Sequence, residues 1–175
     1  MKKCMLLLLV LSFLNTHAQN DYTDRDKFKI GVNAALPLGD AADFSSFSLG
    51  LDVAYQYGVS KSFDIGLASG FTNAFGKTEN FSDGGITIET SFDNIQFLPL
   101  AGVFRFYPTV RSRVNFGADL GYAVGISDGN SGGFYYRPIV VIDIGRGTEI
   151  NFSYTGISLD GGSWETATLG LHFAF

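Results

Sequence analysis

The chain has 175 residues, of which 46% are hydrophobic, and it contains 22 glycines and 17 phenylalanines. Seventeen acidic residues against twelve basic ones give a formal net charge of −5. This acidic balance excludes nucleic acid as an expected partner, because a protein that binds nucleic acid presents a basic face.

The first 18 residues have the pattern of a secretory signal peptide. Lys2 and Lys3 are followed by an apolar run, 5–14, and then by Thr16-His17-Ala18, which has small side chains where a signal peptidase reads. The apolar run has about ten residues, whereas a membrane-spanning helix needs roughly twenty. We therefore expect cleavage after Ala18.

Cleavage leaves 19–175 as one domain. The mature domain then has ten basic and seventeen acidic residues, which give a formal net charge of −7. Cys4 is the only cysteine of the chain, so the mature domain is expected to hold no disulfide and no thiol chemistry. No later stretch resembles a transmembrane helix, which leaves a closed β-barrel as the one way to cross a bilayer.

Eight segments in which apolar and small or polar residues alternate follow one another along the domain. The predicted strands are 27–38, 47–59, 62–75, 95–107, 113–126, 134–144, 149–157 and 164–175. Most are longer than the five or six residues usual in globular sheets and fit tilted membrane strands of roughly 9–11 residues. Their number is even, as in bacterial single-chain membrane barrels.

The predicted connections differ in length. The short ones are 60–61, 108–112 and 145–148, and the longer ones are 39–46, 76–94, 127–133 and 158–163. Short turns at the periplasmic end and longer loops at the outer end are typical of outer-membrane barrels. Within the longest loop, 85–90 is expected to extend a hairpin beyond the membrane.

The two faces of the strands predict which side meets lipid. The face opposite the bulky side chains is rich in glycine, whereas a solvent-facing surface favours long charged side chains. An eight-stranded barrel has an interior just wide enough for side chains. We therefore expect the bulky face to meet lipid, with no charge on it in strands two, three, five, six or eight. The alternative is a secreted soluble β-barrel or sandwich with the bulky face inside.

Charged residues on the inner face are expected to pair, because an unpaired buried charge is costly. Lys29, Arg105 and Glu149 share this inner face. The predicted polar network of the lumen consists of Asp52, Asp64, Asp119, Arg137, Asp143 and His172.

The last strand carries its large apolar residues at alternate positions up to the final residue. It resembles the terminal strand of bacterial outer-membrane barrels, where that strand is the recognition signal for insertion. The resemblance implies that Leu169, Leu171, Phe173 and Phe175 are an assembly signal and that the barrel-assembly machinery is a partner during biogenesis.

With the signal peptide and the eight strands, the chain resembles the small Gram-negative outer-membrane β-barrel proteins, the OmpA/OmpX-like and "porin family" group. The 16–19 junction and Phe97-Leu98-Pro99-Leu100 are similar to the Bacteroidetes branch, which includes PorT-like proteins. The resemblance implies an all-β, eight-stranded antiparallel up-and-down transmembrane β-barrel in contact with outer-membrane lipid.

Catalytic and metal-binding patterns are expected to be absent. Lipid A deacylases of the PagL type carry a His-x-Ser motif on the penultimate strand, but here Gly156 occupies the place of the histidine before Ser158. His172, the one histidine of the mature domain, would need Ser153 or a neighbour within hydrogen-bond reach to act as a base. The acidic residues of 76–94 lack the spacing of a calcium loop. We expect no cofactor and no metal.

These observations predict a non-enzymatic integral outer-membrane protein with a structural or surface-interaction role and a lumen plugged by side chains. Its expected partners are membrane lipid and an unidentified extracellular or periplasmic protein. One alternative is a PorT-like component of an envelope secretion or assembly apparatus. The other is a lipid-modifying enzyme, which the glycine at position 156 disfavours.

Overall fold

The computed structural model of the chain describes residues 27–83 and 86–175. The predicted signal peptide, 1–18, and its cleavage site lie outside the described residues. Nearly all of the described chain is strand. The eight long strands are β1 (Lys27–Leu38), β2 (Ser45–Ser60), β3 (Phe63–Gly76), β6 (Ile95–Phe106), β7 (Val114–Gly125), β8 (Gly133–Gly145), β9 (Thr148–Leu159) and β10 (Gly162–Ala174).

These strands close into one antiparallel barrel, in which each long strand pairs with the long strands before and after it. β10 returns to β1 and closes the barrel, with Ile30 opposite Phe173 and Ala34 opposite Leu169. The predicted fold class, an eight-stranded antiparallel up-and-down barrel, is confirmed. Every strand end lies within two residues of its predicted position, because the alternation of side chains that defines a strand is long and regular here.

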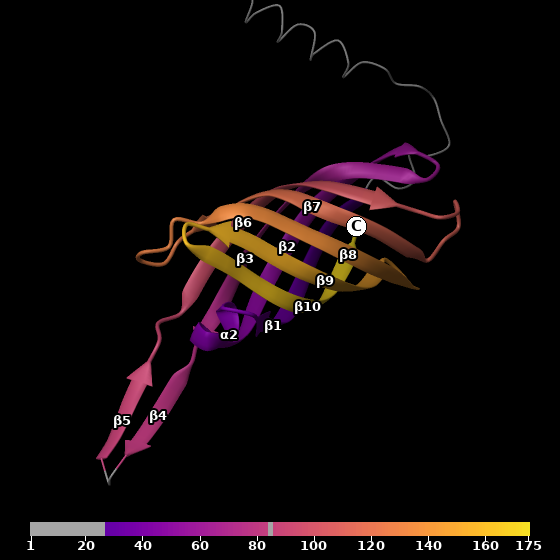
Figure 1. Cartoon of the computed structure of the whole chain (residues 1–175). Helices are drawn as coiled ribbons and strands as arrows, with labels where there is room; N and C mark the ends of the chain where they lie inside the picture. The colour runs from indigo at the N-terminus through magenta and orange to yellow at the C-terminus, as the bar shows by residue number, and fades with distance from the viewer. Residues whose placement is uncertain (1–26, 84–85) are drawn as a thin grey trace, which may run out of the picture.

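The two ends of the barrel differ (Figure 1). One end carries the short helix α2 (Ala41–Phe44) and a hairpin of β4 (Thr78–Asp83) and β5 (Ile86–Ser91), which projects away from the barrel. The segment predicted to extend a hairpin, 85–90, overlaps β5, and this hairpin extends beyond the barrel as a two-stranded sheet of its own. Its position relative to a membrane stays a prediction. The other end is closed by the turns 61–62, 107–113 and 146–147.

Two predicted loops are corrected by the structure. The loop 39–46 contains α2, because Ala41 packs against the interior of the barrel and is 1% exposed. The loop predicted for 158–163 is a two-residue turn, Asp160-Gly161, with Gly161 at a φ of 97°. An Asp-Gly pair between two strands of alternating pattern is a strong hairpin signal, so this two-residue turn was predictable from the sequence. No helix in the described part of the chain is long and apolar enough to span a membrane.

The bulky side chains point out of the barrel, and the polar ones point in. Leu67 is 73% exposed and Leu36 is 64% exposed, whereas Asp119 is fully buried. Outward apolar residues occur on all eight strands of the barrel. The outer wall is thus an apolar belt, which is the arrangement of a barrel whose solvent is lipid.

The expectation that the outer face of the last strand is uncharged is wrong at one position. Glu165 lies between Trp164 and Thr166, both buried in the lumen, and therefore points outward. It shares its parity with Leu169 and Phe173, so the direction of its side chain was readable from the sequence.

Close approach of the strands explains one of the inward glycines. A Cβ on Gly121 would lie 2.0 Å from the backbone oxygen of Leu100, whereas a Cβ on the outward Gly102 would find its nearest neighbour at 3.8 Å. We expect Gly121→Ala to lower the free energy of unfolding by about 1–3 kcal/mol, because the backbone must shift to admit the methyl group. Gly102→Ala, the matched control, is expected to be nearly neutral. Urea titration of the barrel in detergent measures both, and equal midpoints would contradict this account.

Candidate functional site

The lumen of the barrel is filled by a chain of paired charges centred on Arg137. This side chain, from β8, lies between two carboxylates. Its Nη2 and Nε atoms contact Asp119 Oδ2 at 2.7 and 2.9 Å, and its Nη1 atom lies 3.1 Å from Asp52 Oδ2. All three residues are buried, so each charge depends on its partners for stabilisation.

A second arginine extends the chain. Arg105 of β6 donates from Nη1 to Asp119 Oδ1 at 2.6 Å, so Asp119 accepts from two guanidinium groups. Asp64 of β3 is directly opposite Arg105 in the register of the sheet and is 1% exposed. Bidentate and shared contacts of this kind match the planar donors of arginine to carboxylates.

His172 ends the chain on the other side. Its Nε2 atom lies 3.1 Å from Asp52 Oδ2. A Cβ on Gly31 would lie 2.0 Å from the His172 ring, so glycine at this position makes room for the imidazole. The Ser153 hydroxyl has no hydrogen-bond partner in the structure, and His172 is not brought to it. Ser158 lies on the outer side of the wall, away from His172. The described residues therefore do not form a serine–histidine pair.

Two further charges of the lumen pair nearer the end with the short turns. Lys29 of β1 reaches across β10 to Glu149 of β9, with Nζ 2.6 and 2.8 Å from the two carboxylate oxygens. Asp143 is opposite Glu149 in the register of β8 and β9. It is half-buried at the end of β8, and its Oδ1 accepts a hydrogen bond from the Gly145 amide at 2.7 Å, which shapes the turn.

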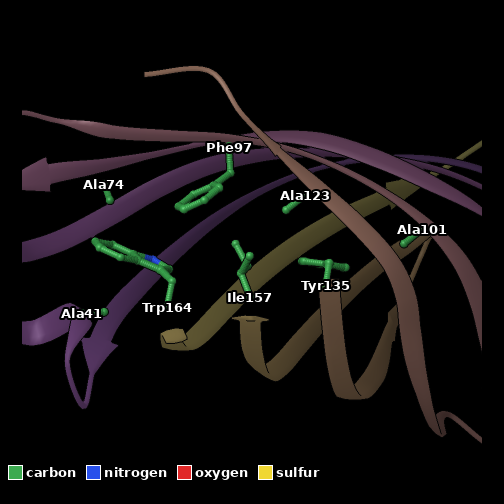
Figure 2. Packing of buried hydrophobic residues seen from close by; sticks show 8 residues of the cluster. All are labelled: Ala41, Ala74, Phe97, Ala101, Ala123, Tyr135, Ile157 and Trp164. Carbon is green, nitrogen blue, oxygen red and sulfur yellow. The ribbon is translucent and has the colours of Figure 1, made fainter. Parts of the chain in front are cut away.

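Apolar side chains fill the lumen toward the end that carries α2 (Figure 2). Phe97 and Trp164 face each other with ring centroids 5.8 Å apart, and Ala41 of α2 packs in the same cluster. The cavity left between this cluster and Arg137 has a volume of about 30 Å³. That is about the share of one water molecule in the liquid, so side chains fill most of the lumen at this level.

The position that lacks the PagL-type histidine is occupied by another side chain. A Cβ on Gly156 would lie 2.1 Å from Cζ of Tyr136, whose ring therefore lies over the glycine on the outer wall. A histidine there would displace this ring. Across the described residues, no group of three or more His, Cys, Asp or Glu side chains is arranged to hold a metal ion.

The predicted network had six members. The structure joins four of them, Asp52, Asp119, Arg137 and His172, by direct contacts. Asp64 lies opposite Arg105 in the sheet, and Asp143 bonds to the Gly145 amide instead. The sequence analysis did not identify Arg105 as the link between Asp119 and β6. The pattern of a single strand shows which face a side chain is on, but not which residues of other strands it contacts. The sequence analysis also missed the Phe97–Trp164 cluster. The inward parity of Trp164, opposite to that of Leu169, was the signal that could have revealed it.

Comparison with solved structures identifies the fold. The crystal structure of Ail, the attachment invasion locus protein of Yersinia pestis, matches with a TM-score of 0.55 and 17% identity over 86% of this chain and 97% of that chain. Ail in a phospholipid bilayer nanodisc gives 0.53 and 17% over 86% and 100%. A de novo designed transmembrane β-barrel gives 0.50 and 10% over 86% and 96%. No family model and no curated protein matches the chain. The chain has the closed antiparallel β-barrel fold of these membrane proteins.

The charge chain makes a specific prediction about stability. Arg137→Met leaves Asp52 and Asp119 buried with fewer partners and is expected to lower the free energy of unfolding by about 3–5 kcal/mol. Arg111→Met, in an exposed turn, is expected to change it by less than about 0.5 kcal/mol. Adding Asp52→Asn to Arg137→Met should restore part of the loss, because contacting residues are not additive. Urea titration in detergent measures these variants together with Asp52→Asn alone, and strict additivity of the two single variants in the double variant would count against the coupling.

Proposed function

We propose that the chain is an integral protein of the bacterial outer membrane, without catalytic activity, that holds the β4–β5 hairpin and its neighbouring loops at the membrane surface for structural or interaction purposes. The observation that carries this proposal is the apolar outer wall around a lumen packed with paired charges. In water an apolar belt of this extent would drive aggregation. No observation on the described residues favours the PorT-like alternative over a general surface role.

The projecting hairpin is the element best suited to contact a partner. Its base is tied to α2, because the Lys77 amide donates to the Phe44 carbonyl at 2.9 Å and the Phe92 amide donates to the Lys77 carbonyl at 3.0 Å. The Phe44 and Phe92 rings pack edge to face, with centroids 5.3 Å apart. These contacts fix the base of the hairpin to the barrel, and a fixed base reduces the entropic cost of binding.

Membrane insertion and orientation are tested together by cysteine labelling. Since Cys4 belongs to the predicted signal peptide, one introduced cysteine is expected to be the only thiol of the mature chain. In intact Gram-negative cells, a membrane-impermeant maleimide is expected to label Ser91→Cys, at the hairpin end. It should label Arg111→Cys, at the opposite end, only after permeabilisation.

Unheated samples of both variants should also migrate differently from heated ones on a denaturing gel, as a folded barrel does. Recovery of the protein as a soluble periplasmic monomer would refute the proposal. Labelling of Arg111→Cys but not of Ser91→Cys in intact cells would show that the barrel has the opposite orientation.

We also propose that the terminal strand is the assembly signal. Phe175 is 77% exposed, and its backbone pairs with Phe28, with the Phe175 amide 2.8 Å from the Phe28 carbonyl oxygen. The Phe175 side chain contributes little to the packed interior. Phe175→Ala should therefore change the free energy of unfolding of refolded protein by less than about 0.5 kcal/mol. In cells the same substitution should reduce the fraction of protein in the outer membrane. Normal assembly of the variant would count against this role.

A further inference from the structure

Three phenylalanines form a row across the outer wall at the end of the barrel with the short turns. Phe63 of β3 is opposite Phe106 of β6, and Phe106 is opposite Phe116 of β7. Residues directly opposite each other in an antiparallel sheet point to the same face, so the three side chains lie at one level on neighbouring strands. The residues are 38%, 47% and 46% exposed. Aromatic girdles of this kind mark the level at which a membrane barrel passes from the lipid chains to the headgroups.

Basic side chains lie in the two turns directly beyond this phenylalanine row. Lys61 belongs to the turn between β2 and β3, and Arg111 and Arg113 belong to the turn between β6 and β7. The two turns are joined, because the Tyr107 amide donates to the Ser62 carbonyl at 2.9 Å. All three basic residues are exposed. The turns therefore place positive charge next to the apolar row.

The charge of the two arginines is available to an anion. Among the described residues, neither Arg111 nor Arg113 takes part in an ion pair. Asp143 is next to Arg113 in the sheet, since its amide donates to the Arg113 carbonyl at 2.7 Å, but its Oδ1 atom accepts from the Gly145 amide. The exposed acidic side chains that the structure describes all lie at the opposite end of the barrel: Asp40, Asp43, Asp93, Asp128 and Asp160.

We propose that the phenylalanine row, together with Lys61, Arg111 and Arg113, forms a binding site for one phospholipid whose headgroup has a net negative charge. The lipid phosphate accepts hydrogen bonds from the two guanidinium groups, and the acyl chains lie along the phenylalanine rings. Guanidinium groups match phosphate oxygens with paired donors. An amine in the headgroup would bring a further positive charge to the same cluster, so an amine headgroup is disfavoured.

The site rests on the proposed membrane function, since it needs lipid around the barrel. The short turns are predicted to lie at the periplasmic end, and the leaflet of the outer membrane at that end consists of phospholipids. Phosphatidylglycerol is a phospholipid with a net negative headgroup, so the predicted orientation brings the site to a leaflet that can supply its ligand.

The turn between β8 and β9 provides an internal comparison. It lies at the same end of the barrel and carries one basic residue, the exposed Arg146. The outward side chains next to it on β8 are the aliphatic Ile142 and Ile144. Removal of the charge of Arg146 changes the net charge of this end without changing the proposed site, so it is a matched control.

Native mass spectrometry of the full barrel in detergent tests the site. The protein is offered phosphatidylglycerol and phosphatidylethanolamine with identical acyl chains at equal concentration. The wild type is expected to retain the glycerol lipid about fivefold more than the ethanolamine lipid, which is the factor that one basic side chain contributes near an anionic lipid. The double variant Arg111→Gln/Arg113→Gln should lower this preference to less than about twofold, and Arg146→Gln should keep it.

A second pair of variants distinguishes a lipid from a free phosphate. Phe106→Ala removes the centre of the phenylalanine row and should reduce the retention of phosphatidylglycerol at least about twofold, because the acyl chains lose an apolar contact. Phe152→Ala, at an exposed phenylalanine of β9 outside the row, should leave the retention unchanged. Displacement of the lipid by inorganic phosphate, with no effect of Phe106→Ala, would show a phosphate site and overturn the proposal.

Two further outcomes would overturn it. These are equal retention of both lipids by the wild type and a preference that survives the double arginine variant. Heat-dependent gel migration of every variant is checked first, because a wild type without it contradicts membrane insertion rather than the lipid site.

Discussion

The barrel depends on the contact between Arg137 and its two carboxylates. Asp52 of β2 and Asp119 of β7 lie on strands that do not pair with each other, and the guanidinium group joins both from a third strand. In a lipid environment these charges have no solvent outside the wall, so they must be satisfied within it. The strand number sets the width of the lumen, and the buried charges within that width must find partners among one another.

The two halves of the lumen are filled by different kinds of side chain. Toward the short turns, Lys29 pairs with Glu149, and the arginine–aspartate chain follows. Toward α2, the aromatic rings of Phe97 and Trp164 pack against each other, and the buried Nε1 atom of Trp164 has no hydrogen-bond partner in the structure. This division explains why β6 carries bulky residues on both faces: Phe97 and Val103 are buried inside, while Leu100 and Phe104 face outward.

Much of the fold was predictable from the sequence because each strand has two chemically distinct faces over many residues. The parity of Arg137 and His172 gave the direction of their side chains, and burial then implied pairing. Which aspartate each group contacts was not predictable, since that depends on the tilt and register of strands distant in sequence. Asp143 shows this limit, because it has inward parity but lies at the level of a turn.

The position of α2 ties the hairpin mechanically to the barrel. Phe44, at the end of the helix, packs on Phe92 at the base of the hairpin, and Ala41, at its start, packs in the cluster that contains Trp164. The hairpin, which is inserted between β3 and β6, is therefore held at its base by a helix from another part of the chain, so a substitution in α2 would alter the support of the hairpin without touching the hairpin itself.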